Sequence, residues 1–403
     1  MRILLINNQH HIVGGAHRVY FNTAYLLKNH GHDVFYFSMR DEKMLPNEYA
    51  KFFPTATDYR NISSISKIKA VNKFIYNREA FSNILDYIDI IKPDVAHINL
   101  FLGGLTTSIL RALKKKKVPV VLTVHDYRLI CPAYLFIDGE NKICEQCKDR
   151  FYLHCTIKRC SEKNLPQSAM LSLDAYFRKY FVKPLKYIDG LIFVSRFTQD
   201  KHIEFNSGYK LKAKILYNFI PDLKIIKSNE SKGEYFLYYG RLSREKGLKT
   251  LIEAASSVKI KLKIAGTGPL SGHYKNLLNI ELLGYKSGEE LWDLVRNASF
   301  IIIPSECYEN NPLTILEAYA HGKPVIGACI GGIPEIIEHG KTGFLFDVGN
   351  KEQLKDALST ASQLTASQYK KMSVNARQFA ESHFDPDSHY RSLMNIYNEI
   401  IHY

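Results

Sequence analysis

Short apolar runs alternate with segments of helical periodicity along this chain, which is typical of parallel sheets covered by helices. A helix is predicted from about residue 16 to residue 30, and Gly31 is expected to end it in a left-handed conformation. The apolar runs of the first half predict strands at 3–6, 34–37, 95–98, 118–124, 191–194 and 215–216.

A second alternating set follows the polar stretch 228–233, which together with Pro221 and Asp222 is typical of an interdomain linker. We therefore predict a domain over 1–222, a second over 223–385 and a C-terminal helical segment over 386–403. A helix is expected at 313–320. The strands predicted in the second half are 235–239, 262–265, 300–303 and 324–326.

Length and composition support two globular domains. The chain has 403 residues, of which 46% are hydrophobic and 23% charged, so a largely disordered chain is excluded. No apolar run approaches the length of about 18 residues that crosses a bilayer. The first residues, MRILLINN, lack the long apolar region of a signal peptide, so we expect a first strand and a cytoplasmic protein.

Positive charge is concentrated in the first half. The whole chain carries a net charge of +14; residues 1–222 hold 33 Lys and Arg against 20 Asp and Glu, whereas residues 223–403 hold 21 against 20. This asymmetry indicates an anionic partner for the first half, such as lipid headgroups, a phosphate-bearing acceptor or nucleic acid. The run 114–117 is four lysines, which could equally be the solvated end of a helix.

Cysteines are clustered in the segment of about 131–160, which is predicted to be an insertion. Five of the seven cysteines lie there. The Cys-x-x-Cys spacing is compatible with a structural zinc site, although free thiols are the alternative, since the second pair is spaced too widely for a standard pattern. The candidate zinc ligands are Cys144, Cys147, Cys155 and Cys160.

Two glycine turns in the second half indicate a phosphate-bearing ligand. Gly240 and Arg241 follow a predicted strand, and Lys246 lies shortly before a helix, so two cations flank a turn that has unpaired amides. Gly266 and Gly268 follow the next strand and would let a ligand approach the backbone. Each turn alone could be an ordinary surface turn.

Two glutamates eight residues apart form a third candidate. Glu309 precedes the helix at 313–320 and Glu317 lies inside it, so one carboxylate could bind the sugar and the other the ribose of a nucleotide sugar. The alternative is a helix N-terminal acid and a salt bridge at the edge of the core. Amides near Asn311, Pro312 and Leu313 would face an anionic group.

The first half offers its own candidates at predicted strand ends. Gly14 and Gly15 follow the first strand and could bring amides to a phosphate or a sugar. His125 and Asp126 end an apolar strand, at the position where α/β proteins bind ligands. Arg196 follows another strand and is a candidate contact for an anionic group. Arg196 and Asp126 are both candidate contacts for the acceptor or its phosphate.

Together these residues resemble a family 4 retaining glycosyltransferase of the GT-B fold. The resemblance spans most of the chain. It rests on the Gly14-Gly15 loop, on the paired glutamates in ENNPLTILEAYAHGKPVI, and on YYGRLSREKG, LKIAGTGP and IGGIPEIIEHGKTGFLF. It implies an α/β protein with two Rossmann-like domains facing across a cleft, and a last helix that crosses back to the first domain.

The resemblance also implies roles for these residues. Arg241 and Lys246 would bind the donor diphosphate, Glu317 the ribose and Glu309 the donor sugar, while His125 would line the sugar pocket from the other domain. The glycines Gly14, Gly15, Gly240, Gly266 and Gly268 would line the donor site, and no catalytic metal or other cofactor would be required.

The leading hypothesis is therefore a hexosyltransferase. It would use a UDP- or GDP-sugar and act on a glycan or a lipid-diphosphate-linked glycan, in the synthesis of lipopolysaccharide, capsule or exopolysaccharide. The basic first half suits peripheral contact with the inner face of the plasma membrane. Exposed aromatic residues could aid this contact, although such residues are more often part of the core; the candidates are Phe74, Tyr76, Phe81, Tyr180 and Phe181. The alternative is a nucleotide-sugar epimerase of the same fold. Nucleic-acid binding is disfavoured because RNP and helix-turn-helix patterns are absent.

Overall fold

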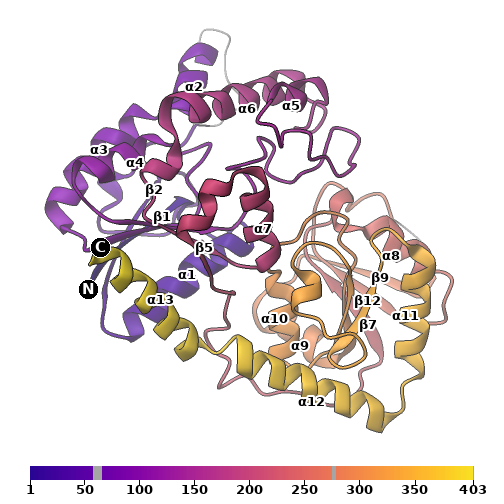
Figure 1. Ribbon diagram of the computed structural model, residues 1–403. Coiled ribbons are helices and arrows are strands. Elements are labelled where there is room, and N and C mark those ends of the chain that lie inside the picture. Colours follow the sequence, from indigo (N-terminus) through magenta and orange to yellow (C-terminus); the bar gives the residue numbers. More distant parts are fainter. Residues whose placement is uncertain (58–65, 275–277, 403) are drawn as a thin grey trace. The chain divides into compact units, whose positions relative to one another are not determined.

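The computed structural model describes residues 1–57, 66–274 and 278–402 (Figure 1). The chain forms two compact units, one made of Met1–Leu216 with His389–Tyr403 and the other of Tyr217–Ser388. Each unit contains a six-stranded sheet in which all paired strands are parallel. In the described residues, no helix is both long and apolar enough to cross a membrane.

The first unit is built on a sheet of order β2-β1-β3-β4-β5-β6. Its strands are almost continuously apolar, as expected where helices cover both faces of a parallel sheet. The strands are β1 (Arg2–Gln9), β2 (Asp33–Met39), β3 (Val95–Ile98), β4 (Val120–Val124), β5 (Gly190–Phe193) and β6 (Ala213–Ile215). The helices are α1 (Gly15–Asn29), α2 (Ser66–Ile75), α3 (Arg78–Ile91), α4 (Ser108–Lys115), α5 (Leu153–Ile157), α6 (Leu165–Phe177) and α7 (Arg196–Phe205).

The second unit has a sheet of order β12-β11-β10-β7-β8-β9. The strands are β7 (Tyr235–Tyr239), β8 (Leu262–Ala265), β9 (Ile280–Gly284), β10 (Ala298–Ile303), β11 (Val325–Ala328) and β12 (Gly343–Phe346). The helices are α8 (Leu248–Ala255), α9 (Gly288–Asn297), α10 (Leu313–Ala320), α11 (Lys351–Gln363) and α12 (Ala366–His383).

Short turns of tighter or wider helix complete both units. In the first unit they are η1 (Ala50–Phe52), the π-helical η2 (Arg178–Val182), η3 (Pro184–Lys186) and η4 (Ser207–Lys212). In the second unit they are η5 (Arg244–Lys246) and η6 (Ile333–Glu335).

Helix α13 (Pro386–Ile401) contributes most of its length to the first unit, beside β1 and α1 (Figure 1). Its apolar side chains Leu393, Ile396 and Tyr397 are buried in the core formed by β1, α1, β3, β4 and β5. The Tyr397 hydroxyl hydrogen-bonds His97 Nδ1 on β3 at 2.6 Å. The predicted return of the last helix to the first domain is therefore confirmed up to Ile401, while Tyr403 lies outside the described residues.

The predicted strands are present, with ends displaced by at most a few residues, and the predicted helix at 313–320 coincides with α10. Two strands, β9 and β12, escaped the sequence analysis. Both lie at the edges of the second sheet; β9 is only partly buried and lacks the strong apolar pattern of a central strand, whereas β12 is a short run of four residues, GFLF, that is mostly buried. Gly31 has a φ of +78° just after α1, as its predicted role requires.

Candidate active site

The four glycine- and glutamate-bearing segments of the second unit all follow strands that are neighbours in its sheet. Gly240 follows β7, Gly266 follows β8, Glu309 lies in the loop after β10, and Gly331 lies in the loop after β11. Because parallel strands end at the same edge, the order β11-β10-β7-β8 gathers these segments there. The chain reverses its direction across the sheet between β7 and β10, and such a reversal is where open α/β sheets bind ligands.

An ion pair joins the loops after β7 and β10. Lys246 Nζ donates to Glu309 Oε1 at 2.6 Å, and Ser305 Oγ donates to the same oxygen, also at 2.6 Å. The side chains of Lys246 and Glu309 are 29% and 15% exposed, so the pair is partly shielded but remains accessible. Since both hydrogen bonds reach Oε1, Oε2 can accept hydrogen bonds from a ligand hydroxyl.

Both members of this pair are charged at neutral pH. Burial by itself would raise the pKa of Glu309, but the charge and hydrogen bond of Lys246, together with the Ser305 hydroxyl, lower that pKa below its ordinary value. For Lys246, burial opposes ionisation and the Glu309 charge outweighs it, so the pKa of Lys246 is raised. The loop junction therefore carries a fixed ammonium and a fixed carboxylate.

Glycine is required where the loops cross. Gly247 has a φ of +69°, and a Cβ there would lie 1.8 Å from the Pro304 carbonyl oxygen. At Gly266, whose φ is +146°, a Cβ would lie 1.9 Å from the Gly240 carbonyl oxygen. The backbones of neighbouring strand ends thus approach more closely than any side chain permits.

Arg241 is exposed immediately beyond this contact. The Tyr238 hydroxyl donates to the Arg241 carbonyl oxygen at 2.7 Å, which holds the backbone while the guanidinium extends into solvent. Lys246 follows at the end of η5, so one exposed cation and one cation paired with Glu309 border the same turn. Such a combination suits a ligand with two phosphates.

Helix α10 carries the second glutamate. Pro312 is its N-cap residue, and the helix begins at Leu313, so its first amides lie at the edge of the sheet where the strands end. Glu317, which is half-buried on this helix, accepts a hydrogen bond from the Tyr239 hydroxyl at 3.1 Å. Tyr239 ends β7, and the structure therefore places Glu317 beside the strand that leads into Gly240 and Arg241.

The sequence analysis did not foresee the role of Asn218. Its backbone N–H donates to Asn311 Oδ1 and its Nδ2 donates to the Asn311 carbonyl oxygen, both at 3.0 Å. Asn311 was expected to present its backbone amide to an anionic ligand. In the structure, its side-chain and backbone oxygens bind Asn218 and so hold the segment around Asn218, where the chain enters the second unit. A reciprocal Asn pair separated by 93 residues has no local signal in the sequence.

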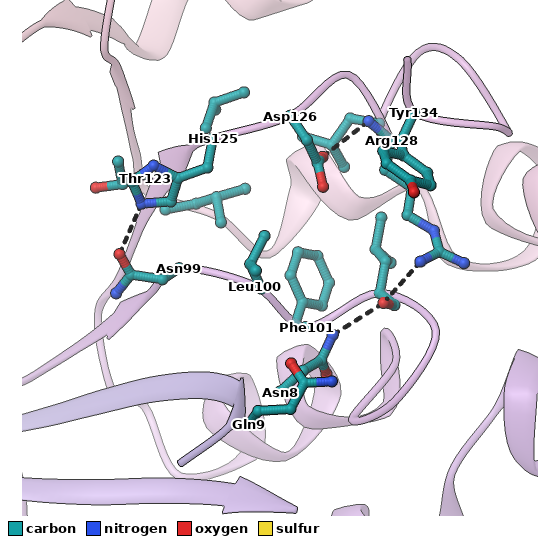
Figure 2. Close-up of a pocket in the computed structure, with 14 residues that line it drawn as sticks. Asn8, Gln9, Asn99, Leu100, Phe101, Thr123, His125, Asp126, Arg128 and Tyr134 are labelled. Atoms are coloured by element: carbon teal, nitrogen blue, oxygen red, sulfur yellow. Dashed lines mark hydrogen bonds between the residues drawn. The ribbon is translucent and has the colours of Figure 1, made fainter. Parts of the chain in front are cut away.

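In the first unit, a pocket of about 240 Å³ opens at the ends of β1, β3 and β4 (Figure 2). These strands flank the reversal point of this sheet, between β1 and β3. His125 Nε2 donates to Asn99 Oδ1 at 2.8 Å, and Arg128 Nη1 donates to the Leu102 carbonyl oxygen at 3.1 Å. Asn8 and Tyr134 also line the pocket.

Burial controls the charges of this pocket. It lowers the pKa of His125 to about 3, with a smaller contribution from His17, so the imidazole is neutral at physiological pH. Burial also raises the pKa of Asp126, although the Arg128 N–H donates to its Oδ1 at 2.9 Å and opposes the shift. A neutral histidine beside polar amides can orient sugar hydroxyls without a net charge.

Three other predicted residues of this unit lie on helix starts. Gly14 is the N-cap of α1 and Gly15 its first residue, and both are exposed. Arg196 is the exposed first residue of α7, after the Ser195 N-cap. These residues follow β1 and β5, so they lie at the same edge of the sheet as the pocket.

The predicted zinc site is not assembled. Across the described ranges, no group of three or more His, Cys, Asp and Glu side chains is placed to hold a metal ion. Cys144, Cys147, Cys155 and Cys160 are free thiols. The Cys155 and Cys160 thiols hydrogen-bond each other, and this bond raises the pKa of Cys155 and lowers the pKa of Cys160.

Family models match both halves of the chain. Residues 13–222 match the model "Glycosyltransferase Family 4", and residues 221–379 match "Glycosyl transferases group 1". The chain belongs to glycosyltransferase family 4. The resemblance inferred from the sequence is thereby confirmed, and the enzyme is a glycosyltransferase.

Relatives of this glycosyltransferase include proteins of polysaccharide synthesis. It is 25% identical to an uncharacterised 42.6 kDa protein in the cps region of Klebsiella pneumoniae, over 83% of this chain and 87% of that protein. It is 30% identical to the amylovoran biosynthesis glycosyltransferase AmsK of Erwinia amylovora, over 40% and 43%. An uncharacterised glycosyltransferase of Methanocaldococcus jannaschii is 31% identical, over 45% of this chain and about half of its own length, 51%.

Solved structures confirm the fold. HepE of Anabaena, determined with UDP and glucose, matches with a TM-score of 0.66 at 16% identity, over 99% of this chain and 100% of HepE. A sucrose-phosphate synthase of Thermosynechococcus elongatus matches with a TM-score of 0.70 at 16% identity, over 99% and 98%. The glycosyltransferase therefore has two Rossmann-like domains of the GT-B type.

Proposed function

We propose that this glycosyltransferase transfers a hexose from a nucleotide-diphosphate sugar to a glycan or lipid-linked glycan, with retention of configuration, in the synthesis of a cell-surface polysaccharide. The observation that carries the proposal is the Lys246–Glu309 ion pair, held at the reversal point of the second sheet between glycine turns. A UDP-hexose is the first donor to consider, because HepE shares the fold and was determined with UDP and glucose.

The site suits the departure of a diphosphate. Negative charge grows on the leaving phosphate as the glycosyl bond breaks, and preorganised cations stabilise that charge more in the transition state than in the ground state. Lys246 is fixed by Glu309, Arg241 extends into solvent beside it, and the first amides of α10 face the same edge. In this proposal these groups supply the charge stabilisation without a catalytic metal or other cofactor.

The glutamates have separate tasks in the proposed mechanism. Glu309 accepts hydrogen bonds from donor-sugar hydroxyls through Oε2, while Glu317 accepts from the ribose. The acceptor hydroxyl oxygen bonds to the anomeric carbon on the face from which the diphosphate departs. The leaving phosphate oxygen takes the proton of that hydroxyl, so no protein base is needed.

We assign the acceptor to the first unit. Its pocket at the ends of β1, β3 and β4 has neutral and amide side chains that suit a sugar, and Asp126 and Arg196 are the predicted acceptor contacts. His125 is the predicted contact for the donor sugar. The relatives named for amylovoran biosynthesis and for a cps region support a polysaccharide intermediate as the acceptor class. The basic first half supports peripheral contact with the cytoplasmic membrane face.

A donor panel tests the proposal. Thermal unfolding of the full chain with UDP- and GDP-hexoses should show a raised midpoint for at least one nucleotide sugar, because a ligand of the folded state stabilises it. The stabilising sugar is then incubated with the protein alone and its hexose analysed. Slow hydrolysis of the donor is expected. An epimerised hexose would instead show that the enzyme is a nucleotide-sugar epimerase. If no nucleotide sugar raises the midpoint, both the transferase and the epimerase hypotheses are contradicted.

A further inference from the structure

A second pocket of the first unit, of about 320 Å³, has no part in the site described above. It is formed by the π-helical turn η2 and the following η3, by Arg150 and Tyr152 of the Cys-rich segment, and by Asn206 and Tyr209 around η4. Three segments distant in sequence thus meet around one cavity.

The charged residues that line this pocket are all cations. They are Arg150, Arg178, Lys179, Lys183 and Lys186, and no Asp or Glu lines it. Arg178 is buried and paired with Asp174 at 3.0 Å. Within residues 1–57, 66–274 and 278–402, the other four cations form no ion pair, although Lys179 Nζ donates to the Arg150 carbonyl oxygen at 3.1 Å.

These four cations surround one cavity, so the electrostatic potential there is positive and favours the entry of an anion. A phosphate or diphosphate fits best, because its several oxygens accept hydrogen bonds from guanidinium and ammonium groups at once. The Asn206 side chain adds a neutral polar group to the lining.

This pocket adjoins the predicted acceptor pocket. Leu129 lines both cavities. Arg178 Nη1 donates to the carbonyl oxygen of Arg128, the residue before Leu129, at 2.8 Å. Arg128 in turn lines the pocket of His125. The two pockets are therefore neighbours on either side of Leu129, as a ligand with a sugar in one and a phosphate in the other would require.

We propose that the pocket between η2, η3 and Arg150 binds the phosphate or diphosphate group of the acceptor. The assignment to an acceptor rests on the proposed function, whereas phosphate binding can be measured without it. The exposed aromatic residues of the same turn indicate how such a group could be presented. Tyr180 and Phe181 are 58% and 69% exposed, and Lys179 Nζ lies 4.9 Å from the Tyr180 ring centroid, an arrangement that suits a lipid-borne phosphate.

Calorimetric titration of the full chain with inorganic pyrophosphate tests the pocket. Saturating UDP is present, so that the donor site is occupied. Lys183→Gln/Lys186→Gln should weaken pyrophosphate binding by about tenfold or more, because two of the four unpaired cations are lost. The control Lys114→Gln/Lys115→Gln removes the same charge from exposed lysines at the end of α4 and should bind as the wild type does.

Pyrophosphate binding that is equal in the pocket variant and the wild type would overturn the proposal, as would equal weakening in both variants. Unchanged thermal unfolding of each variant shows that the fold is intact. UDP binding, measured first and separately, reports on the donor site: its absence would contradict the proposed function, while the comparison of the two lysine variants still decides the phosphate pocket.

Vesicles identify the source of the phosphate. Sedimentation with phosphatidylcholine vesicles, with and without phosphatidic acid, is compared for the wild type, the pocket variant and Tyr180→Ser/Phe181→Ser. Retention that needs phosphatidic acid and falls in both variants supports a lipid-borne phosphate. Pyrophosphate binding without vesicle retention supports a soluble phosphate-bearing acceptor, and failure of both ligands to bind overturns the site.

Discussion

Lys246 Nζ and Glu309 Oε1 lie 2.6 Å apart although 63 residues separate them in the chain. The contact exists because β7 and β10 are neighbours in the second sheet, so the loop after each strand ends beside the other. The ion pair joins Lys246, which is predicted to bind the donor diphosphate, to Glu309, which is predicted to bind the donor sugar. Each member holds the other ionised, so neither can be altered without changing both.

Glu309→Gln should therefore lower the turnover number by about 10²-fold, because the amide neither fixes the Lys246 charge nor accepts as strongly from a sugar hydroxyl. Steady-state kinetics with the donor identified by the panel provides the measurement. Glu306→Gln is the matched control, since Glu306 lies in the same loop and accepts from Thr250 Oγ1 instead. Equal activity of the two variants would contradict the role of Glu309.

Arg241→Ala should also act mainly on turnover. The exposed guanidinium has no hydrogen-bond or ion-pair partner in the part of the chain that the structure describes, so the melting temperature should stay unchanged. The loss of leaving-group stabilisation should lower kcat by about 10²-fold or more. Arg244→Ala removes another exposed arginine three residues along the same turn and should remain active. A similar loss in both variants would indicate a general charge effect.

Glu317→Ala should weaken donor binding, by about tenfold or more, because a half-buried carboxylate is a strong acceptor for ribose hydroxyls. Calorimetry with UDP measures this loss without an acceptor. Tyr239→Phe keeps the ring but removes the hydroxyl that bonds Glu317, so it should weaken UDP binding less than Glu317→Ala does. If UDP affinity survives in Glu317→Ala, the ribose assignment is wrong.

Gly266→Ala should destabilise the second unit by about 3 kcal/mol, since a Cβ would lie 1.9 Å from the Gly240 carbonyl oxygen and the φ of +146° disfavours any side chain. Chemical denaturation measures the change. Gly272→Ala is the control, because a Cβ there meets nothing within 4 Å. Wild-type stability of Gly266→Ala would mean that the two loops do not approach so closely.

His97 predicts a pH dependence of stability. Burial lowers its pKa to about 3, from an ordinary value of 6.5, so the unfolded chain takes up the proton first as the pH falls. The contribution of neutral His97 to the free energy of unfolding is complete above pH 6.5 and is lost as the pH falls from 6.5 towards 3. At about pH 5 the loss amounts to about 2 kcal/mol.

Urea denaturation of His97→Gln at neutral and at acidic pH measures this contribution. The variant should lose less stability on acidification than the wild type does. Tyr397→Phe removes the hydrogen bond to His97 but not the titrating group, so it should retain the full acid sensitivity. Identical pH profiles for the wild type and His97→Gln would show that His97 does not titrate differently on folding.

The sequence predicted the parts of this protein that local pattern determines. The central strands are continuously apolar, and α10 begins after a proline, so both are visible in a short window. The pairing of Lys246 with Glu309 depends on which strands become neighbours, and apolar periodicity carries no information on strand order. The Asn218–Asn311 hydrogen bonds likewise join residues that are 93 positions apart, so apolar periodicity does not predict them.

The aromatic residues show the same limit. Phe74 was a candidate either for membrane contact or for the core; it is 5% exposed and packs under the Arg128 guanidinium, so it belongs to the core. Tyr180 and Phe181, from the same prediction, are exposed. Which aromatic residue faces solvent depends on the turn geometry of η2, a π-helical segment that shifts the helical register and that periodicity does not reveal.

The place of α13 has a consequence for biosynthesis. Leu393, Ile396 and Tyr397 complete a core whose other members come from the first two hundred residues. A ribosome releases them only after the whole second unit has been made. The first unit must wait in an unfinished state, with the apolar surface that α13 will cover open to chaperones, until α13 has been synthesised.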